Sequence, residues 1–245
     1  MSEYFKDTIR INTQKSRITA IDSHTEGEAT RLIVGGLDPI PGDTMFKKLD
    51  RFKSGYDHVR TLLTREPRGS KNILAAAVTS NVSKDAGFGL LYMDARRYPY
   101  LCGHATIGAV VTLSKTGFLK LADGENTIGV DTPSGMMEAH VVMDGDDVVS
   151  VAINMVPSFV YKTGQTVMVD GFGAISVDLV CTGGFFAMVD SRHLGIAPTL
   201  KNKNVLVDLG MKIIQAANEQ LTLTHPLRPQ VNTVDVTEFW ESGKS

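Results

Sequence analysis

The chain has 245 residues, of which 42% are hydrophobic and 21% are charged, a balance typical of a folded globular protein. A chain of this length can form one large domain or two smaller ones, and it buries enough surface to fold without disulfides or metal ions. Its formal net charge is −2, and no dense cluster of Lys and Arg appears. The charge therefore argues against nucleic acid or an anionic membrane surface as a partner.

The two cysteines, Cys102 and Cys181, lie far apart in the sequence and make neither a disulfide framework nor a zinc-ligand pattern. A single long-range disulfide between them is an alternative, although so low a number of cysteines is more typical of a protein in a reducing compartment. Residues 1–16 are polar and mixed in charge, without the apolar core of a signal peptide, and no apolar run is long enough to span a membrane. We therefore expect a soluble cytoplasmic protein without a bound metal.

Short β-rich runs dominate the chain. Strands are predicted, in chain order, at residues 17–23, 30–37, 73–80, 87–94, 136–143, 148–156, 167–180 and 185–190. Helical periodicity appears in three segments, at residues 50–64, 103–116 and 203–221. Strands and helices do not alternate regularly enough for a doubly wound parallel sheet, so we predict a mixed α/β fold.

Two of the predicted helices indicate which face they bury. In the first helix the apolar side chains fall mostly on one side: Phe52, Tyr56, Val59, Leu62 and Leu63. In the third helix another set aligns roughly on one side: Val207, Met211, Ile214 and Leu221. We expect both sets to pack against the core, because the apolar stripe of a surface helix faces inward.

A weak internal repeat suggests two similar units. In each, an apolar strand reaches an Asp that is followed by a Gly at the same spacing, Asp22 with Gly27 and Asp178 with Gly183. Another apolar strand and then an amphipathic helix come after each pair. Chance readily produces such similarity, so the alternative is that the two segments are unrelated. A true repeat predicts two units built on one plan.

This repeat sets the predicted domain organisation. We assign residues 1–16 to an N-terminal extension, residues 17–150 to the first unit and residues 151–245 to the second. The first unit continues into further strands and the helix after Cys102. We expect the second unit to be incomplete, because residue 245 is reached before an equivalent element occurs.

Cys102 directly precedes the helix predicted at residues 103–116. A helix that starts there would leave the backbone N–H groups near Gly103, His104 and Ala105 unpaired. With the helix dipole, those donors stabilise a thiolate, lower the thiol pKa and offer a site for a carboxylate. Gly103 leaves room for a ligand near the backbone, and His104 adds a donor, an acceptor or a charge. The alternative is structural, because free cysteine is usually a small buried hydrophobe.

Other polar residues carry weaker signals. Residues 22–31 hold more polar groups than a turn needs, which would suit a functional site. A solvated turn with an internal ion pair explains these polar groups equally well. We expect Glu66 and Arg68 to form a structural salt bridge, because Pro and Gly shape a turn there. Cys181 lies in a glycine-rich turn with no helix after it, which favours a structural role.

Five motifs occur in the same order as in the proline racemase family: AIDSHTEGEATRLIVGG, LLTREPRG, LCGHATIGA, NMVPSF and GGFFAMVD. The resemblance runs from about residue 17 to about residue 240. That family includes proline racemases, 4-hydroxyproline epimerases and trans-3-hydroxyproline dehydratases. The resemblance implies a diaminopimelate-epimerase-like fold, in which each of two similar units is a curved sheet around a central helix and the active site lies between the units. It also implies a homodimer.

The resemblance further implies an isomerase that uses no cofactor and acts on proline or hydroxyproline. One cysteine thiolate removes the substrate Cα proton, while a second cysteine thiol delivers a proton to the opposite face. Inversion of a carbon needs such a base and acid on opposite sides. Cys102 matches the first catalytic cysteine. Gly103 and His104 match residues that contact the substrate carboxylate or amine.

The sequence departs from the family pattern at several positions. The second catalytic cysteine of the family lies in the motif Asp-Arg-Ser-Pro-Cys-Gly-Thr-Gly-Thr, which does not occur in these 245 residues. Cys181 falls where family members usually carry an aromatic residue. Ser70 replaces a usual His, and Leu74 stands where a substrate-facing Phe is common. The dehydratases carry Thr in place of the second cysteine, so three readings stay open: a racemase or epimerase, a dehydratase with one thiol base, and a non-catalytic binding or structural homologue.

Overall fold

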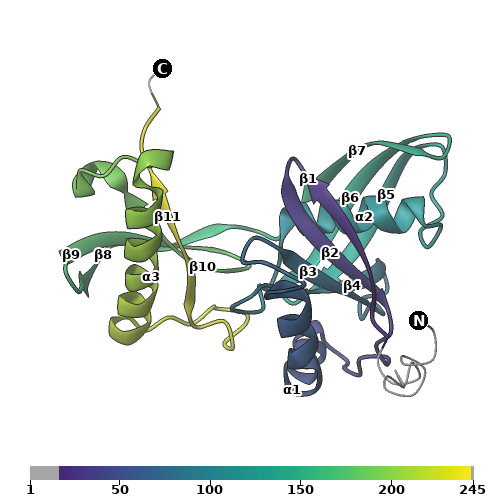
Figure 1. Cartoon of the computed structure of the whole chain (residues 1–245), viewed down its shortest axis with the longest axis horizontal. Coiled ribbons are helices and arrows are strands. Elements are labelled where there is room, and N and C mark those ends of the chain that lie inside the picture. The colour runs from purple at the N-terminus through teal and green to yellow at the C-terminus, as the bar shows by residue number, and fades with distance from the viewer. Residues whose placement is uncertain (1–16, 244–245) are drawn as a thin grey trace, which may run out of the picture. The chain divides into compact units, whose positions relative to one another are not determined.

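The computed structural model describes residues 17–243 (Figure 1). Within that range the chain divides into two compact units, the first ending at Met155 and the second starting at Val156. The boundary expected after residue 150 lies inside a strand, Asp147–Asn154. The N-terminal extension expected at residues 1–16 falls outside the described range. None of the helices described here is long and apolar enough to cross a membrane.

The first unit contains a seven-stranded sheet whose strands follow one another in chain order. The strands are β1 (Thr19–Thr25), β2 (Glu28–Gly35), β3 (Leu74–Thr79), β4 (Ala86–Met93), β5 (Gly124–Thr132), β6 (Gly135–Asp144) and β7 (Asp147–Asn154). Two neighbouring pairs are parallel, β2 with β3 and β4 with β5. Parallel neighbours need a crossover connection. The two crossovers contain α1 (Met45–Thr64) and α2 (Gly103–Lys115).

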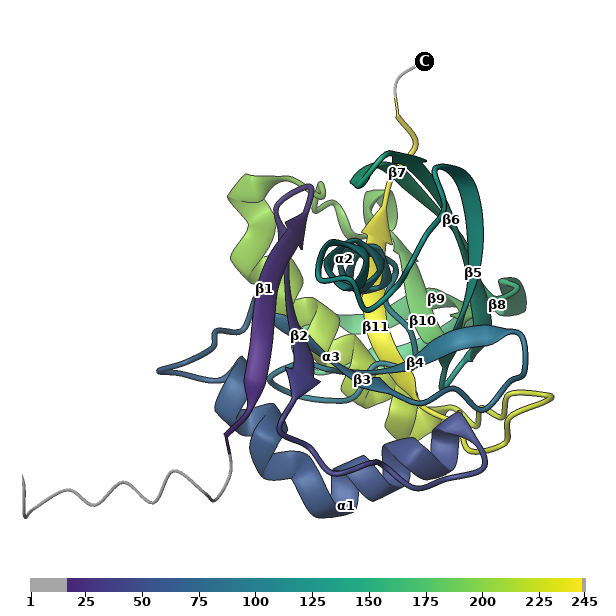
Figure 2. The same cartoon turned by 90° about the vertical axis from the view of Figure 1, so that its right-hand side faces the viewer.

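The sheet of the first unit curls around α2. This helix contacts β1 and β2 at one edge of the sheet and also β7 at the other edge. Viewed nearly along its axis, α2 lies inside the curve that the strands describe (Figure 2). The helix α1 packs on the opposite face, against β3 and β4. The resemblance predicted a curved sheet around a central helix, and the first unit has this arrangement.

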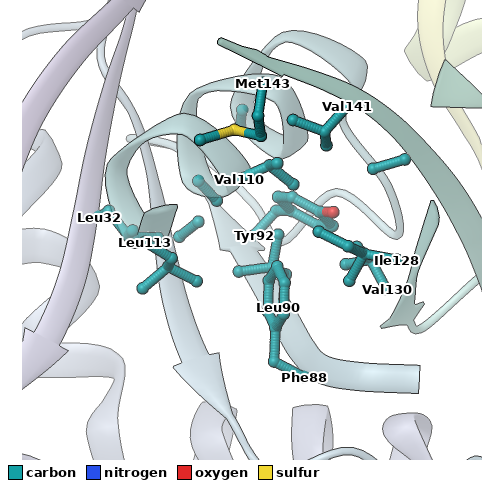
Figure 3. Packing of buried hydrophobic residues seen from close by; sticks show 14 residues of the cluster. Leu32, Phe88, Leu90, Tyr92, Val110, Leu113, Ile128, Val130, Val141 and Met143 are labelled. Atoms are coloured by element: carbon teal, nitrogen blue, oxygen red, sulfur yellow. The ribbon is translucent and has the colours of Figure 1, made fainter. Parts of the chain in front are cut away.

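The strands β2, β3 and β4 are buried on both faces, with α2 covering one face and α1 the other. Leu32, Ala76 and Leu90 belong to the cluster around α2, whereas Ile33 and Leu91 belong to the cluster around α1. Figure 3 shows the cluster around α2, in which the aromatic side chains of β4 meet residues of the helix and of β5 and β6. Strands buried on both faces appear in the sequence as apolar runs without alternation, which is why β3 and β4 were easily predicted.

The helix α1 begins five residues before the predicted start at residue 50. The side chain of Thr44 caps it by accepting a hydrogen bond from the backbone N–H of Lys47. Its first turns bury Met45 and Leu49. The prediction missed them because polar residues separate them from the main apolar stripe. Within that stripe Leu62 is exposed, contrary to expectation.

The second unit contains a four-stranded sheet in the order β11–β10–β9–β8. Its strands are β8 (Phe159–Val169), β9 (Gly173–Thr182), β10 (Gly184–Asp190) and β11 (Val234–Trp240). Two short 3-10 turns, Ser191–Leu194 and Leu200–Asn202, lead into α3 (Lys203–Gln220). This helix connects the parallel strands β10 and β11 and packs against β8, β10 and β11.

Several predictions for strands and for α3 were wrong. The strand predicted at residues 167–180 is the end of β8 and most of β9, joined by a turn in which Gly171 has a φ of +79°. The strands β5 and β11 were missed. Val207 and Met211 are 59% and 45% exposed, whereas α3 buries a second apolar set: Leu209, Ile213, Ala216 and Ala217. Both sets have helical spacing, and only the close approach of α3 to β11 at Gly210 selects between them.

Candidate active site

Cys102 is the N-cap residue of α2, with extended backbone angles of φ −156° and ψ 117°. The first intrahelical hydrogen bond runs from the backbone N–H of Thr106 to the Cys102 carbonyl oxygen, at 3.1 Å. The Cys102 side chain does not cap the helix, and no acidic residue lies in the first turn. No acidic side chain in the first turn of α2 therefore offsets the positive end of the helix dipole.

The Cys102 sulfur lies close to the polar groups of the first helical turn. Its Sγ atom is 3.3 Å from Nδ1 of His104. The nearby backbone N–H groups of Ala105 and His104 lower the thiol pKa. Among charged groups, Arg97 also lowers this pKa and Glu28 raises it. Donors of the first helical turn therefore lie close enough to the thiol to affect its pKa.

Burial nevertheless outweighs these donors. It raises the pKa of Cys102 to about 11, because the sulfur is mostly removed from water and packs against the apolar cluster around α2. The net shift is opposite to the lowered pKa that the helix-terminus argument predicted, since an apolar environment disfavours the thiolate. At neutral pH the sulfur therefore carries its proton in this structure.

Gly103 and His104 occupy the first two positions of α2. Within the described part of the first unit, a methyl group at Gly103 would meet only Sδ of Met155, at 3.8 Å, so this unit leaves room beside the backbone. The carbonyl oxygen of His104 accepts a hydrogen bond from Oγ1 of Thr25, at 3.0 Å. The strand β1 thus anchors the start of the helix.

Two residues that sequence reasoning missed lie directly behind Cys102. The hydroxyl of Thr106 donates to the Cys102 carbonyl oxygen at 2.8 Å. The hydroxyl of Tyr92 on β4 lies 2.6 Å from Oγ1 of Thr106. Thr106 belongs to the recognised LCGHATIGA motif and could have been flagged there. Tyr92 lies in an apolar strand, where its sequence context looks like core.

The polar residues at 22–31 are in part structural. Arg31 makes a two-pronged contact with Asp22, at 2.8 and 2.7 Å, and its remaining nitrogen donates to the carbonyl oxygens of Leu63 and Arg68. The internal ion pair considered for this segment is therefore present. The predicted salt bridge between Glu66 and Arg68 is not formed.

Cys181, the second cysteine of the chain, is shielded from water. Cys181 is completely buried on β9, and burial raises the pKa of its thiol. This environment suits the structural role predicted for it.

Within residues 17–243, no group of three or more His, Cys, Asp and Glu side chains gathers where it could hold a metal ion.

The fold belongs to a known class of epimerases. A hydroxyproline epimerase from Agrobacterium vitis, solved with bound trans-4-OH-L-proline, matches with a TM-score of 0.83 and 26% sequence identity. The match covers 90% of this chain and 65% of that one. The predicted mixed α/β, epimerase-like fold is thereby confirmed.

The sequence comparison identifies the family. The model of the proline racemase family matches residues 20–245, and the chain belongs to that family. A proline racemase of Acetoanaerobium sticklandii is 36% identical, and a 4-hydroxyproline 2-epimerase of Streptosporangium roseum is 37% identical. Each match covers 91% of this chain and 67% of the relative. The chain therefore spans about two thirds of the length of these relatives.

Proposed function

We propose that this chain acts in the cofactor-independent racemisation or epimerisation of proline or hydroxyproline, with Cys102 moving the proton at the substrate Cα. The observation that carries the proposal is the thiol at the N-terminus of α2, beside the backbone N–H groups of His104 and Ala105, which lower its pKa. Family membership and relatives named proline racemase and 4-hydroxyproline 2-epimerase support the substrate class.

The geometry suggests a role for each group. The free N–H groups at the start of α2 would bind the substrate carboxylate, and Gly103 leaves room for it to approach. When the Cα–H bond breaks, its electron pair delocalises into that carboxylate and its proton passes to the Cys102 thiolate. The helix-terminal donors stabilise the charge that develops. His104, with Nδ1 3.3 Å from the sulfur, is placed to orient the thiol or exchange a proton with it.

The raised thiol pKa is compatible with this chemistry. A thiol with a pKa of about 11 holds its proton at neutral pH and can deliver it to a carbanion. Its thiolate is correspondingly basic, which favours removal of a weakly acidic Cα proton. Inversion also needs a proton donor on the opposite face, and the family's second cysteine motif does not occur in these 245 residues.

A second candidate function follows from this single helix-terminal thiol. Dehydration of 3-hydroxyproline needs one base. The thiolate takes the Cα proton, the electron pair forms a carbon–carbon double bond, and the C3–O bond breaks. The leaving hydroxide takes up a proton, for which the newly formed thiol is a donor, and departs as water. Cys102 alone suits this reaction, because Cys181 is completely buried. The non-catalytic alternative, a binding or structural homologue, makes no use of thiol basicity.

Incubation in D2O separates these functions. L-proline, trans-4-hydroxy-L-proline and trans-3-hydroxy-L-proline are each incubated with the protein, while Cα deuteration, optical rotation and loss of water are followed. Deuteration with inversion supports the racemase or epimerase, and loss of water from the 3-hydroxy substrate supports the dehydratase. Absence of exchange and elimination with all three substrates would overturn the enzymatic proposal. Cys181→Ser is the matched control for Cys102→Ser.

The remaining partner and location predictions stay predictions. The family resemblance implies a homodimer, which sedimentation equilibrium would check. The cytoplasmic location is tested by fractionation of the source cells with an antibody against the chain.

A further inference from the structure

A pair of buried hydroxyl groups lies behind the first turn of α2. Tyr92 and Thr106 are both completely buried, and their oxygens are 2.6 Å apart. Tyr92 projects from β4 into the apolar cluster around α2, next to Val110 and Leu90 (Figure 3). A hydroxyl at that depth is costly unless it is hydrogen-bonded, and this contact gives the Tyr92 hydroxyl its partner.

The direction of the hydrogen bonds follows from the protons available. Thr106 has one hydroxyl proton, and it donates that proton to the Cys102 carbonyl oxygen at 2.8 Å. Oγ1 of Thr106 must then accept from Tyr92. Burial raises the pKa of Tyr92 well above its usual range, so the phenol keeps its proton. A directed chain therefore runs from the Tyr92 O–H through the Thr106 O–H to the Cys102 carbonyl oxygen.

This chain ends on a peptide unit at the proposed site. The Cys102 carbonyl oxygen accepts two hydrogen bonds, from the backbone N–H of Thr106 at 3.1 Å and from its hydroxyl. The same peptide unit carries the N–H of Gly103, the first of α2, which has no partner within the helix. Donors on a carbonyl polarise the peptide unit and increase the positive charge on its N–H. They also fix the plane in which that N–H points.

We propose that Tyr92 and Thr106 are positioning residues that orient and polarise the Cys102–Gly103 peptide, so that the Gly103 N–H attracts the carboxylate of the substrate. This inference rests on the proposed function, which places a carboxylate at this helix terminus. The two side chains act through the peptide bond.

Another threonine of the first unit provides a matched comparison. The hydroxyl of Thr64 donates to the carbonyl oxygen of Arg60, four residues earlier, at 2.7 Å. Thr64 is also completely buried. The Arg60 carbonyl, however, belongs to a peptide inside α1, whose N–H is used within the helix rather than at its start. Thr64→Val therefore removes the same kind of bond without affecting a free helix-terminal donor.

Two alkylating reagents measure the proposed effect directly. Iodoacetate carries a carboxylate and iodoacetamide is its neutral amide, and both form an S–C bond with the same thiolate as iodide leaves. The ratio of their rates at Cys102 therefore cancels the thiol pKa and reports the attraction of the site for a carboxylate. The rates are read by peptide mass spectrometry on the full chain, which separates Cys102 from Cys181.

Tyr92→Phe and Thr106→Val are expected to lower the iodoacetate-to-iodoacetamide ratio about threefold, the scale of one modest hydrogen bond. Thr106→Ser keeps the hydroxyl and should retain the wild-type ratio, as should Thr64→Val. If Tyr92→Phe and Thr106→Val slow both reagents by the same factor, the two residues are merely structural and the proposal is overturned. A ratio that falls equally in Thr64→Val overturns it as well.

The test stays decisive if one variant does not fold. Tyr92→Phe removes a single oxygen and keeps the ring that packs in the cluster, so its ratio alone can support or overturn the inference. The alkylation ratio requires no turnover. Absence of deuterium exchange would therefore count against the proposed function, whereas an unchanged ratio would count against the role of Tyr92 and Thr106.

Discussion

Each unit contains a hairpin followed by a helix and a parallel strand, but the two units differ in what covers the sheet. In the first unit an antiparallel hairpin, β1–β2, is followed by α1 and the parallel strand β3. In the second unit the hairpin β9–β10 is followed by α3 and the parallel strand β11. The first unit then adds β4 and α2, so helices cover both faces of its central strands. In the described part of the second unit, α3 alone packs on the sheet.

This difference shows where chemistry can be placed. The thiol of Cys102 is positioned by a helix that starts inside a curled sheet, where N–H groups and burial act on it together. Cys181, on β9, has no helix terminus beside it and is sealed by packing. A common topology therefore does not give two equivalent cysteines. The local element that follows each cysteine decides its environment.

The hairpins of the two units also differ in register. Asp22 lies opposite Arg31 on the neighbouring strand, whereas Asp178 lies opposite Met188. The turn between β1 and β2 has two residues and that between β9 and β10 has one, which shifts the pairing by one residue. The two Asp residues of the sequence repeat therefore face non-equivalent positions on their partner strands, although each is more exposed than its neighbours along its own strand.

The largest expected effect separates the two cysteines. Cys102→Ser should reduce Cα deuterium exchange of the substrate by about 10²-fold or more, because it removes the proposed acid–base group. Cys181→Ser should retain most of the exchange rate. Mass spectrometry of the substrate in D2O measures both. Equal losses in the two variants would contradict the assignment of the chemistry to the first unit.

The buried face of α3 can be tested against its exposed face. Ile213→Ala should lower the free energy of unfolding by about 2–4 kcal/mol, because it leaves a cavity in the core of the second unit. Val207→Ala, on the exposed stripe, should change it by less than about 0.5 kcal/mol, since this side chain is 59% exposed. Urea titrations provide the measurement. Similar losses in both would show that the exposed stripe is covered in solution.

Arg31 and Arg192 differ in burial, and replacing them should therefore change the free energy of unfolding by different amounts. Arg31→Met should cost about 2 kcal/mol, because it leaves the carbonyl oxygens of Leu63 and Arg68 without their donor. Arg192→Met removes the contact with Asp190 of a side chain that is 54% exposed, and it should cost less than about 1 kcal/mol. Urea unfolding compares the two. A larger cost for Arg192→Met would reverse the expected order.

A further comparison concerns the pH dependence of stability. The folded pKa of Cys102, about 11, lies above that of an unfolded thiol, so folding favours the protonated form. The stabilisation is complete below about pH 8.5 and is lost as pH rises toward 11. Cys102→Ala should therefore flatten the fall in stability between these pH values. An equally steep fall in the variant would contradict the raised pKa.

Local patterns in the sequence determined much of this protein. Apolar runs located most strands and helical spacing located α1, α2 and α3. Five ordered motifs identified the family, and one of them, around Cys102, located the first turn of α2. The strands β5 and β11 were missed because polar residues interrupt their apolar pattern. Their place in a sheet depends on neighbouring strands that are distant in sequence.

Tertiary structure decided the environment of each side chain. Two apolar stripes on α3 had the same spacing, and only packing against β11 selected Ile213 over Met211. The sequence correctly placed Cys102 at a helix terminus but gave the wrong direction for its pKa. Backbone donors are local and can be read from a motif, whereas burial depends on the strands that surround the sulfur. The same reason hid Tyr92, which reaches Thr106 from a different element of the sheet.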